Sequence, residues 1–315
     1  MGKKTIVLII SIMLAAVLAG CGARKQAEAP AGDVFAEITD VNGRTVKLKK
    51  KPERIIVTSS SFLEPLHEVG GDVVARPDSK TNMPDYAKDK PSIGRTYNVD
   101  MEKLISYTPD LVIINKATNE KLIQPLEAAG IPVIVAKLKS YEDVKNGLRQ
   151  FAVITGHPEK AEAFIADMDK RIEEIKNRLP KKELRVLILH STSQGVSVQL
   201  DSSIAGSVAN LLGFKNVASG MKAMEDKPDA APYSIETAVE QNPDVIFVTS
   251  MGKVDEIKAS MEKTMETNPA WQSIPAVRDK KVYYLSQEHF LLSPCIHYPE
   301  AVEEMARLIY PEGFK

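Results

Sequence analysis

Short apolar runs alternate with amphipathic stretches along the first half of the chain. The runs Arg54–Thr58, Leu111–Ile114 and Val133–Val135 are rich in branched apolar residues and predict buried strands. A hairpin with its turn at Asn42-Gly43 is predicted before them. Helices are predicted at Phe62–Val69, Asp100–Ser106, Asn119–Ala129 and Tyr141–Ile154. This alternation indicates a parallel sheet built from βα units.

The segment Pro158–Leu179 has a different pattern. Its apolar positions are spaced by 4, 4, 3 and 4 residues, which places them on one face of a helix. These positions are Phe164, Met168, Ile172, Ile175 and Leu179. Pro158 suits a first helical turn and Pro180 ends the run. A helix of this length is about 33 Å long, and it divides the alternation in two.

The alternation then starts again. Strands are predicted at Arg185–Leu189, Val245–Val248 and Val282–Leu285, and helices at Ile204–Leu212, Ile235–Val239, Val254–Glu266 and Glu300–Ile309. We therefore expect an α/β fold of two Rossmann-like βα lobes, residues 34–157 and 181–315, joined by a single long rigid helix over residues 158–180. The cleft between the lobes is the default ligand site, because strand-end loops of both sheets face it.

The first residues have the pattern of a lipoprotein signal peptide. Lys3 and Lys4 precede the apolar stretch Thr5–Leu18, which is too short to span a bilayer comfortably. Small residues then lead to Cys21, as expected for a thiol that is lipid-modified after cleavage. We expect residues 1–20 to be the signal peptide and residues 21–33 to be a flexible tether. The protein is then anchored by lipid to the cell membrane, facing the extracytoplasmic side.

Composition excludes several classes of function. The chain has two cysteines, so a lipid on Cys21 leaves Cys295 without an internal disulfide partner. The net charge of -1 gives no basic excess for nucleic acid. An enzyme that uses the cleft is the rival interpretation, but the sequence has no Gly-rich phosphate loop, nucleophile elbow or His-x-x-x-His pair. A surface sensor or adhesin would share most of the remaining features.

One unit of sequence occurs in both halves of the chain. In each copy a Glu lies seven residues before a Pro-Asp pair, and four apolar residues follow. The copies contain Glu102 with Pro109-Asp110 and Glu236 with Pro243-Asp244. Each Glu opens a short helix, where the helix dipole favours a carboxylate, so helix stabilisation alone could explain both.

These features together resemble the class of periplasmic binding proteins for iron complexes and cobalamin. The resemblance runs from Cys21 to Tyr310 and includes the tether, the first strand, the Gly94…Glu102…Pro109-Asp110 segment and the long helix. It implies a monomeric substrate-binding lipoprotein of an ABC importer, with no intrinsic cofactor and an iron complex, a siderophore or haem, as its transported ligand. It also implies that Glu102 and Glu236 dock onto Arg residues of the permease dimer, which works with its ATPase. Cobalamin is the alternative ligand.

Candidate ligand-binding residues lie just after predicted strands or just before the predicted helix of a repeated unit. They are Ser60, Phe62, Arg95, Tyr97, Lys116, His190, Met251 and His289. In similar haem-binding lipoproteins an axial Met occupies the position of Tyr97 and an axial His that of Met251. Neither ligand matches in identity here, but Tyr and Met are both known haem-ligand types. If the ligand is haem, Tyr97 and Met251 would bind its iron. Packing alone would also account for both residues.

A ferric siderophore would use the same loops differently. Arg95 would pair with the charge of the complex and Tyr97 would stack on its planar groups. Cobalamin ranks lower because the single tryptophan, Trp271, is predicted away from the cleft. A bare metal ion is disfavoured because no two of the five histidines have chelating spacing.

Overall fold

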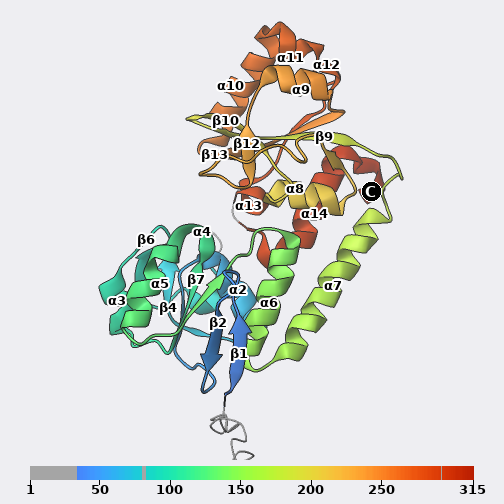
Figure 1. The fold of residues 1–315 in the computed structure, drawn as a ribbon. Coiled ribbons are helices and arrows are strands. Elements are labelled where there is room, and N and C mark those ends of the chain that lie inside the picture. The colour runs from blue at the N-terminus through green and yellow to red at the C-terminus, as the bar shows by residue number, and fades with distance from the viewer. Residues whose placement is uncertain (1–33, 80–82, 292) are drawn as a thin grey trace, which may run out of the picture. The chain divides into compact units, whose positions relative to one another are not determined.

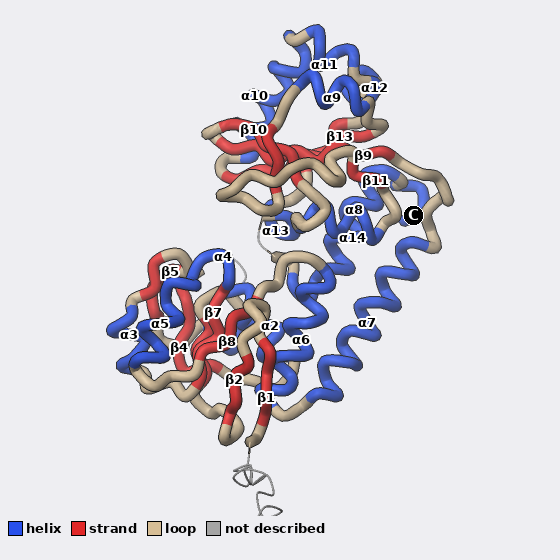
Figure 2. Tube along the Cα trace, in the orientation of Figure 1, coloured by secondary structure: helices blue, strands red, loops and turns tan. Residues whose placement is uncertain are grey.

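The structure is a computed structural model that describes residues 34–79, 83–291 and 293–315. Residues Phe35–Lys315 form one compact unit, and its helices and strands are shown in Figures 1 and 2. Two sheets organise this unit, each covered by helices on both faces. The predicted signal peptide, the tether and Cys21 lie outside the described residues.

The N-terminal lobe contains a six-stranded sheet in the order β6-β5-β4-β3-β7-β8. All neighbouring strands are parallel except β5 and β6, which form an antiparallel hairpin. The strands are β3 (Ile55–Val57), β4 (Val73–Asp78), β5 (Ser92–Arg95), β6 (Asn98–Val99), β7 (Leu111–Asn115) and β8 (Val133–Ala136). The separate hairpin pairs β1 (Ala36–Thr39) with β2 (Thr45–Leu48).

The helices of this lobe are mostly short. They are α2 (Leu63–Glu68), α3 (Met101–Ser106), α4 (Lys116–Asn119), α5 (Ile123–Ala128) and α6 (Tyr141–Thr155), with 3-10 turns η2 (Ser60–Phe62), η3 (Asp85–Ala87) and η4 (Glu120–Leu122). Helix α6 is the best defined of them. It begins with a capping box between Ser140 and Asp143 and ends at Gly156, whose φ of 77° suits glycine.

The C-terminal lobe contains a second six-stranded sheet in the order β12-β10-β9-β13-β14, with β11 also paired to β9. Its strands are β9 (Arg185–Thr192), β10 (Gly195–Gln199), β11 (Lys215–Asn216), β12 (Ala230–Pro232), β13 (Val245–Met251) and β14 (Val282–Tyr284). Its helical segments are α8 (Ile204–Leu211), α9 (Ile235–Gln241), α10 (Val254–Thr267), α11 (Pro269–Ser273), α12 (Pro275–Arg278), α13 (Gln287–Phe290), η5 (Cys295–His297), α14 (Tyr298–Ile309) and η6 (Pro311–Phe314). Strands β9, β13 and β14 are parallel, whereas β10 joins β9 antiparallel.

Helix α7 (Pro158–Lys176) connects the two sheets, as predicted, but it is shorter than the predicted Pro158–Leu179. Beyond Lys176 the chain forms a turn in which the Leu179 amide donates to the Lys176 carbonyl. Its buried face contains Ala161, Ile165, Met168, Ile172 and Ile175. The predicted stripe included Phe164, which is only partly buried, because Ile165 is the residue that turns toward the core.

Each sheet has one face that belongs to its own lobe and one face that belongs to a shared core. In β7, for example, Val112 and Ile114 pack in a cluster of the N-terminal lobe, while Leu111 and Ile113 belong to the shared cluster. In β9, Leu187 and Leu189 pack inside the C-terminal lobe, while Ile188 belongs to the shared cluster. Because side chains alternate between the two faces of a strand, each sheet contributes one of its faces to a single continuous core.

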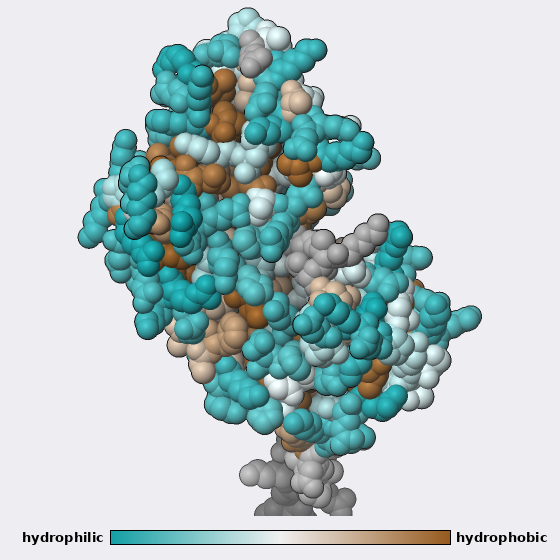
Figure 3. Space-filling model, turned by 180° about the vertical axis from the view of Figure 1, so that it is seen from behind, coloured by the Kyte–Doolittle hydropathy of each residue, from teal (hydrophilic) through white to brown (hydrophobic). Residues whose placement is uncertain are grey.

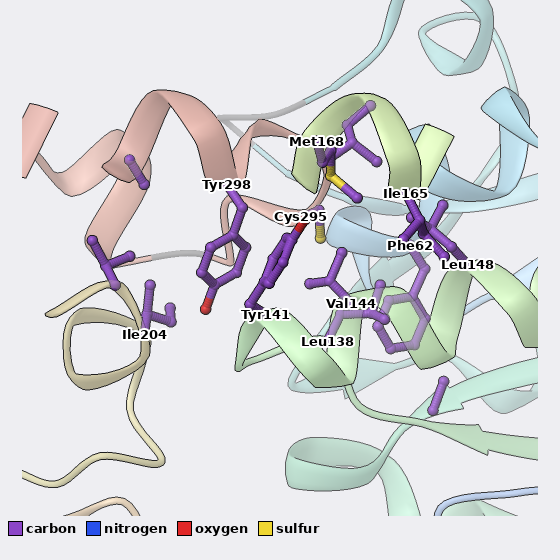
Figure 4. Packing of buried hydrophobic residues seen from close by; sticks show 14 of the residues in the cluster. Phe62, Leu138, Tyr141, Val144, Leu148, Ile165, Met168, Ile204, Cys295 and Tyr298 are labelled. Carbon is purple, nitrogen blue, oxygen red and sulfur yellow. The ribbon is translucent and has the colours of Figure 1, made fainter. Parts of the chain in front are cut away.

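Helices α6, α7, α8 and α14 contribute much of the rest of this shared core. Figure 4 shows Tyr141, Val144 and Leu148 of α6 facing Met168 and Ile165 of α7, with Tyr298 of α14 beside Tyr141. The hydroxyl of Tyr298 donates to the carbonyl of Lys139 at 2.6 Å, and the amide of Tyr141 donates to Ser207 of α8 at 3.0 Å. Side chains from both lobes thus pack directly on one another.

The surface has no broad apolar face in the view of Figure 3, where apolar atoms form small separate patches. Among the described residues, no helix is both long and apolar enough to cross a membrane. The predicted α/β architecture of two lobes is confirmed.

Candidate functional site

The hairpin turn between β5 and β6 presents Arg95 and Tyr97 to solvent. The Tyr97 side chain is 65% exposed, and the Arg95 Nη1 donates to its hydroxyl at 2.6 Å. The Arg95 guanidinium also lies 5.9 Å from the centroid of the Tyr97 ring. The two candidates are therefore brought together as a cation beside an aromatic ring, with most guanidinium donors still available to a ligand.

This turn is held in place by residues that are not exposed. Asn119 donates from its Nδ2 to the Thr96 carbonyl at 2.7 Å, and its Oδ1 accepts from the Thr58 hydroxyl at 2.8 Å. Gly94 has a φ of +89°, and a Cβ there would lie 2.7 Å from the Asn98 carbonyl oxygen, so the turn requires glycine. Asn119 was not among the predicted site residues, since an amide inside a helix gives no sequence signal for such a role.

The other N-terminal candidates differ in exposure. Lys116 is exposed and its Nζ is 3.5 Å from the Val41 carbonyl oxygen, while Ser60 is half-buried. Phe62 is 0% exposed and packs edge to face on Phe151, with ring centroids 5.8 Å apart. The prediction that Phe62 faces the ligand is wrong, because the 3-10 turn after β3 directs its ring into the shared core.

Two C-terminal candidates, His190 and Met251, lie near the carboxyl ends of β9 and β13. Met251 is 54% exposed. The Nδ1 atom of His190 forms a hydrogen bond of 2.9 Å with the Thr249 hydroxyl. Burial, together with the charge of Lys227, lowers the pKa of His190 below its ordinary value of 6.5. Its ring is therefore neutral at neutral pH and can act as a hydrogen-bonding group or a metal ligand.

Gln287 fixes the turn that carries Met251. Its Nε2 donates to the carbonyls of Ser250 and Gly252, each at 3.1 Å. Sequence reasoning placed Gln287 after a strand end but did not assign it this role. A polar residue that follows a buried strand could have suggested it, since such residues meet at the carboxyl edge of a parallel sheet.

His289 lines a cavity of about 360 Å³ to which both lobes contribute. The cavity is lined by Glu64, Met83, Pro84, Glu288, His289, Pro294, His297 and Glu300. His289 Nδ1 lies 2.7 Å from Glu304 Oε2, and hydrogen bonding to Glu304 raises the pKa of His289 despite its partial burial. A second contact, 3.0 Å between His297 Nε2 and Glu64 Oε2, joins the two lobes at this cavity.

The two groups of candidates do not touch each other. Across residues 34–79, 83–291 and 293–315, no hydrogen bond, ion pair or ring contact joins Ser60, Arg95, Tyr97 or Lys116 to His190, Met251 or His289. The same ranges contain no group of three or more His, Cys, Asp or Glu residues that could hold a metal ion.

The repeated unit has the same local structure in both lobes. Asp100 caps α3 by accepting from the Lys103 amide, and Ser234 caps α9 by accepting from the Thr237 amide. Glu102 and Glu236 lie in the first turns of these helices and both are exposed. Glu102 has no hydrogen bond or ion pair with any described residue, whereas Glu236 accepts from the Ser234 hydroxyl at 2.7 Å. The N-caps are thus provided by other residues, which leaves both carboxylates facing solvent.

Residues 55–289 match the model of the periplasmic binding protein family. The chain belongs to this family. The matched region includes both repeated units and every candidate ligand residue, so the resemblance noted from the sequence is confirmed. Membership also supports a binding protein rather than an enzyme, since the relatives below are named as transport proteins.

Two relatives illustrate the similarity of this periplasmic binding protein to curated proteins. An ABC transporter substrate-binding lipoprotein of Bacillus subtilis (strain 168) is 29% identical over 328 residues, which cover 99% of this chain and 99% of the relative. The Fe(3+)-citrate-binding protein of the same strain is 26% identical over 300 residues, covering 89% of each chain.

A solved structure shows the same fold. The crystal structure of Staphylococcus aureus IsdE complexed with heme superposes with a TM-score of 0.69 at 22% identity. The match covers 82% of this chain and 98% of that one. At this identity the likeness establishes the two-lobed architecture alone.

Proposed function

We propose that this chain is the substrate-binding lipoprotein of an ABC importer and that it binds an iron complex between its lobes. The Arg95–Tyr97 pair carries this proposal. An exposed guanidinium beside an exposed aromatic ring suits a planar, oxygen-rich and anionic ligand such as a ferric chelate. The names of relatives in the same family point to the same ligand class, since one is a Fe(3+)-citrate-binding protein and another an iron(3+)-hydroxamate-binding protein.

The C-terminal lobe would complete the site. Met251, on a turn fixed by Gln287, and the neutral His190 offer a thioether and an imidazole on the other side of the ligand. For a ferric siderophore, Arg95 supplies charge, Tyr97 stacks and Met251 packs. For haem, Tyr97 and Met251 would supply an oxygen and a sulfur to the two axial positions of the iron.

Delivery would use the two exposed carboxylates of the repeated unit. Glu102 and Glu236 present one negative charge from each lobe, which suits docking onto positive residues of a permease dimer that works with its ATPase. Cys21 would carry the lipid that keeps a monomeric receptor at the outer face of the cell membrane. Two acyl chains or more on the thiol give stable attachment.

A ligand titration tests the proposal. Purified protein is titrated with ferric citrate, a ferric hydroxamate, a ferric catecholate, haem and cyanocobalamin, and binding is followed by quenching of Trp271 fluorescence and by absorption spectra. We expect at least one iron complex to bind with a dissociation constant of about 1 μM or lower. Binding of cyanocobalamin alone, or of none of the five compounds, would contradict an iron-complex receptor.

A matched pair of variants locates the site in the same titration. Arg95→Ala removes the cation of the exposed pair, whereas Arg278→Ala removes an exposed cation of α12 whose side chain lies beside Asp279. Affinity for the bound iron complex should fall in the first variant and stay unchanged in the second. Equal affinities in all three proteins would place the ligand elsewhere.

A further inference from the structure

Hydrogen bonds from Arg54 connect the carboxyl end of α3 to β3, a central strand of its sheet. This residue directly precedes β3, and its side chain donates from Nε to the Thr108 carbonyl at 2.9 Å and from Nη2 to the Tyr107 carbonyl at 2.6 Å. Both carbonyls belong to the turn in which α3 ends. A cation at a helix carboxyl end is favourable because the last carbonyls are unpaired and the dipole is negative there.

The main chain of Arg54 makes a second set of bonds to the same turn. Its amide donates to Asp110 Oδ1 at 2.9 Å, and its carbonyl accepts from the Asp110 amide at 3.1 Å. Asp110 Oδ2 also accepts from the Glu53 amide at 3.0 Å. Thr108 has a φ of 46°, a left-handed conformation that a residue other than glycine adopts only when its surroundings enforce it.

The C-terminal lobe repeats this arrangement with different residues. Arg185, the first residue of β9, donates from Nη2 to the carbonyl of Gln241, the last residue of α9, at 2.6 Å. Its amide donates to Asp244 Oδ2 at 2.9 Å, and its carbonyl accepts from the Asp244 amide at 2.9 Å. Asn242 has a φ of 44°, so it matches Thr108 in conformation as well as in position.

We propose that Arg54 and Arg185 are positioning residues that set the direction of α3 and α9, and with it the placement of the docking carboxylates Glu102 and Glu236. This inference rests on the proposed function, because it assumes that these carboxylates meet the permease. It also gives the Pro-Asp pair of the repeat a definite role, since Asp110 and Asp244 bind the main chain of the two arginines.

The physical case depends on the shortness of the two helices. With 6 residues in α3 and 7 in α9, neither helix is stable through its own hydrogen bonds. Each must take its direction from what holds its ends. Arg54 directly precedes β3 and Arg185 begins β9, and both strands are paired on both edges, β3 with β4 and β7 and β9 with β10 and β13. A rigid strand therefore defines the axis of each helix.

The matching arrangement in both lobes is the reason to connect it with docking rather than with local stability alone. Two carboxylates that bind one dimer must keep a fixed separation, because simultaneous engagement is lost when the geometry changes. A loosened helix in one lobe should weaken docking even when the ligand site, on other loops, is intact.

Side-chain deletion at each arginine tests this inference. Arg54→Met and Arg185→Met keep the apolar stem and the main-chain bonds but remove the donors to the helix ends. Arg76→Met is the matched control, because Arg76 also donates to main-chain carbonyls, those of Pro77, Ala87 and Lys88, but holds neither helix. Arg54→Lys and Arg185→Lys retain the positive charge but lack the forked donors of a guanidinium. They provide milder variants if a Met variant folds poorly.

Three measurements are made on each full-length variant. Hydrogen exchange reports on the amides of α3 and α9, and the titration described above reports ligand affinity. Uptake of iron-55, supplied as ferric citrate, as a ferric hydroxamate and as haem, is measured in cells whose own gene is replaced by the variant. The double variant Glu102→Ala/Glu236→Ala serves as the reference for lost docking.

In Arg54→Met we expect amides of α3 to exchange about tenfold faster, because two hydrogen bonds to the helix end are lost. Exchange in α9 should rise less in Arg185→Met, since one strong donor bond is lost there. Iron uptake should fall several-fold in Arg54→Met and in Arg185→Met, and it should fall most in the double Met variant. Ligand affinity should stay unchanged in these variants, and the Arg76→Met control should behave as wild type.

The outcomes separate this inference from the proposed function. If Glu102→Ala/Glu236→Ala lowers uptake but the Met variants change neither exchange nor uptake, the arginines do not position the helices. If helix exchange rises and uptake stays normal, the inference also fails. If Glu102→Ala/Glu236→Ala itself takes up iron normally, the proposed docking through these carboxylates is wrong.

Discussion

The ring of Tyr298 packs against the ring of Tyr141, with centroids 5.2 Å apart and planes inclined by 50°. Tyr141 begins α6 of the N-terminal lobe and Tyr298 begins α14 of the C-terminal lobe. Tyr298 is fully buried, and its hydroxyl bonds to the Lys139 carbonyl just before α6. The two lobes therefore meet through an aromatic pair and a buried hydrogen bond, in addition to the connecting helix (Figure 4).

Removing the hydroxyl of Tyr298 should destabilise the protein. In Tyr298→Phe the Lys139 carbonyl loses its buried donor, which costs about 1–3 kcal/mol of unfolding free energy. Tyr283→Phe is the control, since Tyr283 packs on the same core and has no hydrogen bond through its hydroxyl to a described residue. Urea unfolding measures both, and equal stabilities of the two variants would contradict the assignment.

The lobes should move little when ligand binds. Helix α7 contains neither Gly nor Pro after its first residue, and its buried face packs in the core shared by both sheets. Small-angle scattering with and without the bound iron complex should give radii of gyration that agree within about 1 Å. A clear compaction on binding would show that the shared core opens.

Tyr97 and Arg95 should distinguish the two kinds of iron complex. If haem is the ligand, Tyr97→Phe removes an oxygen from the iron, so the Soret band should shift and affinity fall by about tenfold or more. If a ferric siderophore is the ligand, Tyr97→Phe should change little and Arg95→Ala should weaken binding more. Absorption spectra and titrations decide, and no effect of either change on any complex would remove both residues from the site.

The ion pair of His289 with Glu304 should make stability depend on pH. Hydrogen bonding to Glu304 raises the pKa of His289, so its contribution is complete below 6.5 and disappears as pH rises through the folded-state value. Burial alone would raise the pKa of Glu304, but bonds from His289 and Ser286 lower it below 4.5, so its contribution is lost on acidification.

The stability gap between wild type and His289→Gln should therefore be largest between pH 4.5 and 6.5 and shrink toward alkaline pH. Because both side chains are partly exposed, we expect the gap to be at most about 1 kcal/mol. Thermal unfolding of the ligand-free protein across this range measures it. A gap that grows with rising pH would show that the pair is not charged as assigned.

The proposed lipid attachment depends on Cys21, which lies outside the described residues. Cys21→Ala should leave the signal uncleaved or release the protein from the membrane, because no thiol remains to carry acyl chains. Fractionation and the apparent mass on a denaturing gel report the outcome. A variant that remains in the membrane fraction at wild-type size would contradict anchoring at this residue.

The sequence predicted the parallel cores of both sheets because their strands are uninterrupted apolar runs. Strands Leu111–Asn115 and Arg185–Thr192 are examples, and in both the structure adds polar residues at the carboxyl end. Sequence reasoning did not find Val73–Asp78 or Gly195–Gln199. The first ends in Arg-Pro-Asp and the second contains Gly, Ser and Gln, so neither has the apolar pattern of a buried strand.

The loops that carry the candidate residues were predictable, but the directions of their side chains were not. Arg95 and Tyr97 share an exposed turn, as expected for residues that precede a repeat helix. Phe62 occupies an equally plausible position after a strand, but a 3-10 turn rotates it into the core, and propensity does not specify such a turn. The roles of Asn119 and Gln287 depend on contacts between distant segments, which a single sequence does not reveal.

The shared core also has a consequence for the order in which the chain acquires its structure. Helix α14 is the last long helix to be synthesised. Its residues Tyr298, Val302 and Met305 nevertheless belong to the same buried cluster as Ala36, near the start of the described chain. Contacts between such distant segments form slowly, because the loop entropy must be lost before they are made. We therefore expect the N-terminal lobe to stay incompletely packed until the whole chain is available, which would suit the proposed export of the chain across a membrane.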